Sequence, residues 1–355
     1  MIVVTADLLR RQLAAIFEAW GMDRDHIATT VHVMVETDLT GVDSHGVGMM
    51  PTYDRWWREG KINVRPEIRV VRERASVALI DADRSLGHPP STMAMQMAIA
   101  KAKETGIGVV SVQHSNHFGA AGHYALLAAR AGLIGMAMTN AGPILVPTFG
   151  REARLGTNPL AFAAPARKNN PFWLDMATTT VAFGKVNIAR RAGKPIPEGW
   201  ALDTDGKPLT NSQQAFELRR LTPLGGTREL GSHKGYGLAA MVEILCSTLS
   251  GSWLAALDPA TGQPGDRNDI GHFFLALNPD MVRDEGEFRD DMDRLIDMLH
   301  ATPPADPAQP VLVAGDPEFA TYAERSKTGI PMTDTLFKEV REVAKNAGAP
   351  FLLGA

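Results

Sequence analysis

The stretch that decides the fold class is Gly106-Ile-Gly-Val-Val-Ser-Val112, followed closely by His114-Ser-Asn-His-Phe-Gly-Ala-Ala-Gly-His123. A short apolar run that begins at a glycine is typical of a buried strand. The polar loop after it leads into an apolar helical pattern that ends near Gly132. A strand, a loop and a helix in this order predict one unit of an α/β fold, and ligands of such folds usually bind at strand ends.

The same alternation continues on both sides of this unit. We expect strands at residues 77–80, 134–138, 160–164, 172–175 and 272–277, and a helix at residues 91–103. Residues 190–226 contain several glycine- and proline-rich stretches and are predicted as loop and turn. The middle of the chain therefore predicts an α/β sheet domain.

Both ends of the chain have helical patterns. One apolar stripe near the N-terminus consists of Leu9, Leu13, Ile16, Phe17 and Trp20. Similar stripes occur near the C-terminus, within residues 288–299 and 336–343, and such stripes are typical of amphipathic helices. We therefore expect residues 1–72 together with 283–355 to form a helical domain, and residues 73–282 to form the α/β domain.

The composition excludes several classes of protein. The 355 residues are 45% apolar and 21% charged, with a net charge of −4, so no basic excess predicts nucleic-acid binding. No apolar run approaches the length of a membrane span. The single cysteine, Cys246, excludes a disulfide framework. We expect a cytoplasmic protein that binds neither nucleic acid nor membrane.

Two polar loops carry candidate catalytic side chains. Gly41-Val-Asp-Ser-His-Gly-Val-Gly48 follows a helical run and holds Ser44 and His45. His117 lies in the loop after the buried strand, where it could exchange a proton with a substrate hydroxyl or carbonyl. Taken alone, the first loop fits a solvated helix-to-turn junction better than an active site.

The remaining motifs limit the chemistry. His233-Lys234 precedes a glycine-rich helix start. Basic side chains at the positive end of a helix dipole are suited to binding an anion. The spacings of His114, His117 and His123 do not form a metal-ligand set, so no metal is expected. The G-x-G-x-x-G and G-x-S-x-G patterns are both absent. The residues alone predict an α/β enzyme with a histidine acid/base, or else a ligand-binding protein without turnover.

A resemblance to a known family goes further. The chain resembles the malate/L-lactate dehydrogenase family of NAD(P) oxidoreductases in Asp43-Ser-His-Gly46, Asn116-His-Phe-Gly119, Gly156-Thr-Asn-Pro159, Leu174-Asp-Met-Ala-Thr178, Phe183-Gly-Lys185 and His233-Lys-Gly-Tyr236. The resemblance implies a non-Rossmann mixed-sheet nicotinamide-binding domain plus a helical domain formed by both termini. It also implies a homodimer, with NAD or NADP as the cofactor.

The resemblance implies roles for individual residues. His117 matches the family's acid/base, although some members assign the proton to His45 instead. Ser44 and His45 match the pair beside the substrate carbonyl and nicotinamide, and Lys185 falls near that pair. The implied cofactor-binding residues are His45, Gly119, Ala120, Ala121, Trp173, Leu174, Asp175, Met176, Ala177, His233, Lys234, Asn268, Gly315, Asp316, Pro317 and Glu318.

Two positions place the chain within the family and indicate a substrate class. Met49 stands where most members have the arginine that grips the substrate carboxylate, and Met49, Tyr53 and Arg154 look most like the hydroxycarboxylate dehydrogenase B branch. That branch implies interconversion of 2-oxo acids, including aryl ones such as phenylpyruvate, and 2-hydroxy acids. Lys185 stands where cyclic-imine reductases have Asp, which argues against a protonated imine. Cyclic-imine reductases and malate, lactate or ureidoglycolate dehydrogenases are the alternatives.

Overall fold

The computed structural model describes residues 2–263, 265 and 268–354. Its helices are α1 (Ala6–Ala19), α2 (Arg24–Leu39), α3 (Met50–Arg58), α4 (His88–Thr105), α5 (Ala121–Arg130), α6 (Phe183–Arg191), α7 (Ser212–Leu218), α8 (Ser232–Glu243), α9 (Glu287–His300), α10 (Asp316–Thr328) and α11 (Asp334–Ala347). Its strands are β1 (Ile2–Val4), β2 (Arg69–Glu73), β3 (Val77–Asp81), β4 (Ile107–Ser115), β5 (Ile134–Thr139), β6 (Leu160–Ala164), β7 (Phe172–Met176), β8 (Ala201–Leu202), β9 (Pro208–Leu209), β10 (Ile270–Leu277) and β11 (Ile330–Met332).

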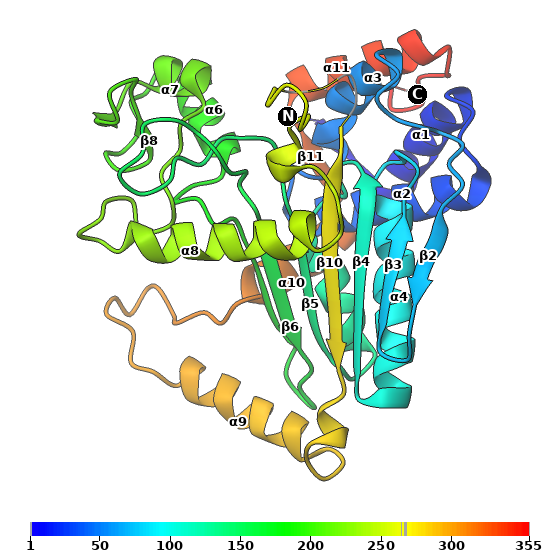
Figure 1. The fold of residues 1–355 in the computed structure, drawn as a ribbon, viewed down its shortest axis with the longest axis vertical. Coiled ribbons are helices and arrows are strands. Elements are labelled where there is room, and N and C mark those ends of the chain that lie inside the picture. The colour runs from blue at the N-terminus through cyan, green and yellow to red at the C-terminus, as the bar shows by residue number, and fades with distance from the viewer. Residues whose placement is uncertain (1, 264, 266–267, 355) are drawn as a thin grey trace.

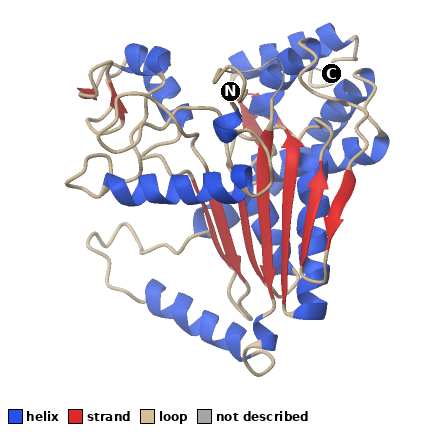
Figure 2. Ribbon diagram, in the orientation of Figure 1, coloured by secondary structure: helices blue, strands red, loops and turns tan. Residues whose placement is uncertain are grey.

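A seven-stranded mixed sheet forms the centre of the molecule, in the order β2-β3-β4-β10-β5-β6-β7 (Figures 1 and 2). β3 and β4 pair in parallel, whereas β10 pairs antiparallel with both β4 and β5. β5, β6 and β7 continue antiparallel. As a result β3, β4, β5 and β7 all run in one direction and end at the same edge of the sheet. This mixed sheet confirms the predicted fold class.

Helices cover both faces of the sheet. α4 and α5 pack on one face, and α8 with the π-helical turn Ile244–Thr248 packs on the other. Glycine in the strands allows the close approach. A Cβ on Gly108 would lie 2.0 Å from the carbonyl oxygen of Ala98 in α4, and one on Gly271 would lie 1.8 Å from that of Cys246. A larger residue at either position would push a helix off the sheet.

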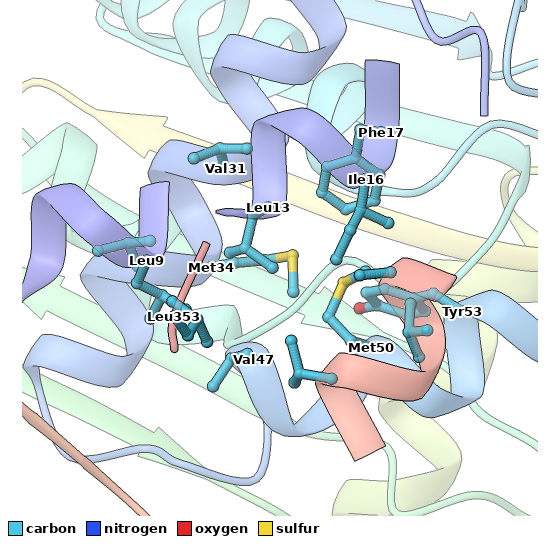
Figure 3. Packing of buried hydrophobic residues seen from close by; sticks show 14 of the residues in the cluster. Leu9, Leu13, Ile16, Phe17, Val31, Met34, Val47, Met50, Tyr53 and Leu353 are labelled. Carbon is cyan, nitrogen blue, oxygen red and sulfur yellow. The ribbon is translucent and has the colours of Figure 1, made fainter. Parts of the chain in front are cut away.

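The helical layer has a core of its own, built from both ends of the chain. Residues of α1, α2 and α3 pack there with β11 and α11. Figure 3 shows Leu9, Leu13, Ile16 and Phe17 of α1 along this core, with Ile16 toward Met50 and Tyr53 of α3 and Leu9 toward Leu353. β1 pairs with β11 and joins the two ends directly. The helical domain formed by both termini is thereby confirmed. The division at residues 72, 73, 282 and 283 stays a prediction; β2 of the central sheet spans its first boundary.

A smaller lobe contains the segment that was predicted as loop and turn. That prediction was wrong in part, because α7 and the β8–β9 pair lie within it and α6 reaches into it. α7 is short and its predictive signal is one capping residue, Asn211, whose side chain accepts a hydrogen bond from the Gln214 amide. Val186, Leu221 and their neighbours form the small core of this lobe.

Two further features complete the fold. α9 lies apart at one end of the sheet (Figure 1), and its Asp293 accepts hydrogen bonds from the backbone amides of residues 167–169. Within the described residues, no helix is long and apolar enough to cross a membrane.

Candidate active site

The loop that carries Ser44 and His45 follows α2 and is held from behind. Gly41 has a φ of +87°, which permits the turn after the helix. Asp38, in the last turn of α2, accepts a hydrogen bond from the Val47 amide at 2.8 Å. Ser44 Oγ lies 2.7 Å from Nδ1 of His45. The loop is therefore tied to α2 by the Asp38 carboxyl group, with Ser44 exposed and His45 half-buried.

Asp38 is a buried carboxyl group. Burial raises its pKa well above the usual value, Asp43 raises it further, and the Val47 amide and Arg325 act in the opposite direction. A Cβ on Gly46 would lie 2.1 Å from Asp38 Oδ1. Gly46 is thus the residue type that allows the loop to close over this carboxyl group.

His117 lies directly after β4, at the sheet edge where β3, β4, β5 and β7 end. Its Nδ1 lies 2.7 Å from the Tyr53 hydroxyl and 3.3 Å from the amide nitrogen of Gly119. The ring of His45 is stacked near it, with 5.4 Å between ring centroids. The structure therefore brings together four of the predicted residues: Ser44, His45, Tyr53 and His117.

Both imidazoles are desolvated while they keep some contact with solvent. Both side chains are half-buried, and protein groups make up much of their surroundings. Desolvation lowers the pKa of His45, and it lowers the pKa of His117 well below the usual value, with His45, His88 and His272 lowering it further. Both rings are therefore neutral at pH 7 in the free protein.

Buried polar side chains fix the loop that carries His117. The Asn116 amide donates to the carbonyls of Arg84 and Ser85, and its oxygen accepts from Asn268 at 2.8 Å. His272 bonds Ser115 and Thr139, both at 2.8 Å, while its ring stacks on Phe118. Asn268, predicted as a cofactor contact, thus supports the backbone beside His117.

Three of the predicted cofactor segments converge near the first turn of α5. Asp175 on β7 accepts a hydrogen bond from the Gly122 amide at 2.7 Å, and Trp173 donates to the Gly122 carbonyl at 2.8 Å. The Trp173 amide also donates to the carbonyl of Ala314, so the segment at Gly315 meets β7. Residues 119–122, 173–175 and 314–318 therefore lie close together at the N-terminal end of α5.

Asp175 and Glu318 are the two carboxyl groups in this group of segments near the N-terminal end of α5. Asp175 keeps contact with solvent, yet desolvation raises its pKa to about 6; the Gly122 amide lowers that pKa and Glu318 raises it. A Cβ on Gly315, whose φ is +105°, would lie 3.0 Å from that of Trp173. Carboxylates that can accept hydrogen bonds from ribose hydroxyls and glycines that permit close approach fit a nicotinamide dinucleotide.

Other predicted residues lie on separate elements. Lys185 is exposed on α6, and His233 and Lys234 are exposed at the start of α8, where His233 contacts Arg228 at 3.0 Å. Arg154 is exposed and forms an ion pair with Glu152. No hydrogen bond or ion pair within the described ranges joins any of the four to His117 or to the Ser44–His45 loop.

Met49 and Tyr53 differ in their surroundings, although both were predicted to contact the substrate. Met49 is half-buried at the edge of the helical core, and Tyr53 is fully buried within it.

In the part of the chain that the structure describes, no group of three or more His, Cys, Asp or Glu side chains could hold a metal ion.

The sequence reasoning missed four residues that shape the site. They are Asp38 and Arg325 behind the Ser44–His45 loop, and His88 and His272 near His117. Asp38 could have been identified from the sequence, because it is a charged residue on the apolar face of a predicted helix. The contacts of the other three depend on residues distant in the chain, so no local pattern could have identified them.

These features define an α/β protein with paired histidines at the carboxyl edge of a mixed sheet, beside a place suited to a dinucleotide. The malate/L-lactate dehydrogenase family model matches residues 4–341, and the chain belongs to this family. It is accordingly an oxidoreductase of the dehydrogenase type. Family membership implies a nicotinamide cofactor and a small hydroxy or oxo acid as substrate.

Individual proteins agree with this assignment. The chain is 40% identical to a malate dehydrogenase of Pyrococcus horikoshii over 97% of this chain and 95% of that protein. It is 31% identical to hydroxycarboxylate dehydrogenase B of Escherichia coli over 97% of this chain and 94% of that protein. The crystal structure of malate dehydrogenase from Entamoeba histolytica superimposes with a TM-score of 0.93 at 32% identity, covering 99% of each chain.

Proposed function

We propose that the protein interconverts 2-oxo acids and 2-hydroxy acids with NAD or NADP, and that His117 moves the proton. The observation that carries the proposal is the placement of His117, which lies at the carboxyl edge of the sheet beside His45 and Ser44. A histidine held in this way can exchange a proton with an oxygen on the substrate carbon that is oxidised or reduced.

The protein's part in the reaction is orientation and proton transfer. The nicotinamide, when bound, supplies or takes the hydride at C2 of the substrate. Ser44 and His45 orient the oxygen on that carbon through their hydroxyl and ring nitrogens. His117 is neutral in the free protein, and an anionic substrate beside it raises its affinity for a proton. Proton uptake by His117 is thereby coupled to substrate binding.

We propose the converging segments as the cofactor site. Gly119 and Ala120 precede α5 and Ala121 begins it, and the N-terminal amides of a helix suit an anion. Trp173–Ala177 and Gly315–Glu318 supply Asp175 and Glu318 as acceptors for ribose hydroxyls. His233, Lys234 and Asn268 are further cofactor residues in this proposal; His233 and Lys234 are exposed at the start of α8, and Asn268 donates to Asn116.

Two observations bear on the side chain of the substrate. Met49 offers an apolar, flexible surface, which suits an aryl group and supports a substrate such as phenylpyruvate. The identity to malate dehydrogenases supports a dicarboxylate instead. We propose Arg154 and Lys185 as candidate partners for the carboxylate, because each carries an exposed cation.

We also propose that the protein is a homodimer. The outer side of α8 and the following segment exposes Met241, Ile244, Leu249 and Leu254, and Ile244 and Leu254 are 57% and 62% exposed. Apolar side chains grouped in this way are typical of a protein–protein interface. A second copy of the chain would cover them.

The test is nicotinamide absorbance with NADH and NADPH against oxaloacetate, pyruvate, phenylpyruvate and a cyclic imine carboxylate. Turnover of a 2-oxo acid is the expected result. Turnover of the imine alone would favour the imine reductase alternative. Cofactor binding seen by fluorescence, with no turnover of any of these compounds, would favour a ligand-binding protein and overturn the proposal.

A further inference from the structure

Tyr53 makes the shorter of the two hydrogen bonds to Nδ1 of His117, at 2.7 Å against 3.3 Å for Gly119. We propose that Tyr53 is a positioning residue that fixes which ring nitrogen of His117 carries the proton. Tyr53 is fully buried, and Figure 3 shows its ring beside Met50 in the helical core. The residue therefore acts on the substrate through His117, which differs from the direct contact predicted for it.

The Gly119 amide indicates which tautomer the Tyr53 hydroxyl stabilises. The Gly119 amide can only donate, and it points at Nδ1 of His117. Nδ1 must then present its lone pair, so the proton of the neutral ring is on Nε2. The Tyr53 hydroxyl, which bonds the same nitrogen, donates to it as well. Tyr53 and Gly119 thus leave Nε2–H as the group that faces a ligand.

A phenol suits this position because it serves both protonation states of the ring. When His117 is neutral, Tyr53 donates to Nδ1. When His117 takes up a proton at Nδ1, Nδ1–H donates and the Tyr53 oxygen accepts. Release of the Nε2 proton to the substrate oxygen then leaves Nδ1–H, which the Tyr53 oxygen still accepts, with no change in the positions of the heavy atoms. Tyr53 can therefore hold the ring in one orientation throughout a cycle of proton uptake and release.

The titratable groups around His117 come from several elements. His45 faces it from the loop before α3, Tyr53 from α3, His88 from α4 and His272 from β10. The three histidines lower the pKa of His117, so they oppose a charge on its ring. The hydroxyl of Tyr53 lies within hydrogen-bond distance of Nδ1 and can accept from it when the ring becomes charged.

Removal of that hydroxyl has two expected effects. The Tyr53→Phe protein keeps the ring volume but leaves Nδ1 with the weaker Gly119 contact, so the Nδ1–H tautomer gains population. Protonated His117 also loses its acceptor. A hydrogen bond to a charged group corresponds to roughly a 10- to 100-fold change in equilibrium, so the pH profile of 2-oxo acid reduction should move by about one to two units toward acid.

The first arm of the test is nuclear magnetic resonance of ring nitrogens in the protein without cofactor or substrate. The wild-type protein should show a neutral His117 with its proton on Nε2, and Tyr53→Phe should show a mixture. A proton on Nδ1 in the wild type overturns the proposal, as does an unchanged tautomer population in Tyr53→Phe. The wild-type measurement decides even if the variant fails to fold.

The second arm is kinetic and rests on the proposed function. Tyr53→Phe should lower kcat and shift its pH profile, with a smaller effect on KM. Tyr124→Phe is the matched control, because it removes another buried hydroxyl, one that donates to the Phe118 carbonyl, and leaves the Tyr53–His117 contact in place. An equal shift in both variants would overturn the proposal. If the wild-type protein reduces no 2-oxo acid, the proposed function fails and the nitrogen spectra still decide the role of Tyr53.

Discussion

Arg325 of α10 binds the carboxylate of Asp43, which lies 282 residues earlier in the chain. The same guanidinium donates to the Asp38 carbonyl at 2.6 Å. The Arg325 side chain is largely buried, with 15% of its surface exposed. One side chain near the C-terminus therefore holds the loop that carries Ser44 and His45, and α10 connects this loop to the segment at Gly315.

Loss of this contact should loosen the loop. In Arg325→Ala we expect kcat to fall roughly 10-fold or more, because a largely buried hydrogen bond to a charged group is lost. Arg294→Ala is the control, since it removes an exposed ion pair with Asp291 on α9 and should have little effect. A wild-type kcat in Arg325→Ala would show that Ser44 and His45 are placed without it.

Proton transfer by His117 gives a second prediction. In His117→Asn we expect turnover to fall roughly 10²- to 10⁴-fold, while cofactor still binds. Steady-state kinetics and a fluorescence titration with NADH measure the two effects. A near-normal rate would assign the proton to His45, and His45→Asn should then be inactive.

The substrate side chain can be tested at Met49. An arginine there would supply a planar cation matched to a carboxylate, and it would remove apolar surface. Met49→Arg should shift preference from phenylpyruvate toward oxaloacetate, by about 1–3 kcal/mol from the lost apolar contact. The ratio of kcat/KM for the two acids is the measurement. A ratio that stays within about twofold would place Met49 away from the substrate.

The proposed dimer makes a prediction for Ile244. A lysine at this exposed apolar position would have to be desolvated in the interface, so Ile244→Lys should be a monomer at micromolar concentration. Val3→Lys, at an equally exposed position on β1, should leave the dimer intact. Light scattering coupled to gel filtration gives both masses. Wild-type protein with the mass of one chain would contradict the dimer.

Buried histidines make the stability depend on pH. Burial lowers the pKa of His88 to about 3 in the folded protein, whereas the unfolded chain titrates near 6.5. Between these values the unfolded state binds the extra proton, so the contribution of His88 to stability is present above pH 6.5 and is lost as the pH falls toward 3. For this one group the free energy of unfolding falls by about 1.4 kcal/mol per pH unit.

His88→Leu should remove that dependence. Both ring nitrogens of His88 lack a hydrogen-bond partner within the described structure, so the leucine removes two unpaired polar atoms as well as the titration. We expect the variant to gain stability relative to wild type as the pH is lowered from 6.5 to 4 in urea unfolding experiments. Parallel stability curves for the two proteins over this range would contradict the assignment.

Local patterns predicted much of this fold, and their limits are physical. The stripe at Leu9, Leu13 and Ile16 is visible because helix periodicity is local, and His117 stands out because it follows a buried strand. The hydrogen bonds of Arg325, His272 and Tyr53 join residues between 64 and 287 positions apart. A local pattern carries no information on such pairs, so the sequence placed Tyr53 in the site without its partner.

The position of β10 has a consequence for how the chain folds. This strand is encoded late, yet it lies between β4 and β5 and pairs with both. During synthesis the facing edges of β4 and β5 stay open until residues 270–277 have been made. Open strand edges are prone to pair with other chains. Nascent chains that stall before this strand should therefore aggregate, and chaperones that hold such edges should raise the yield of folded protein.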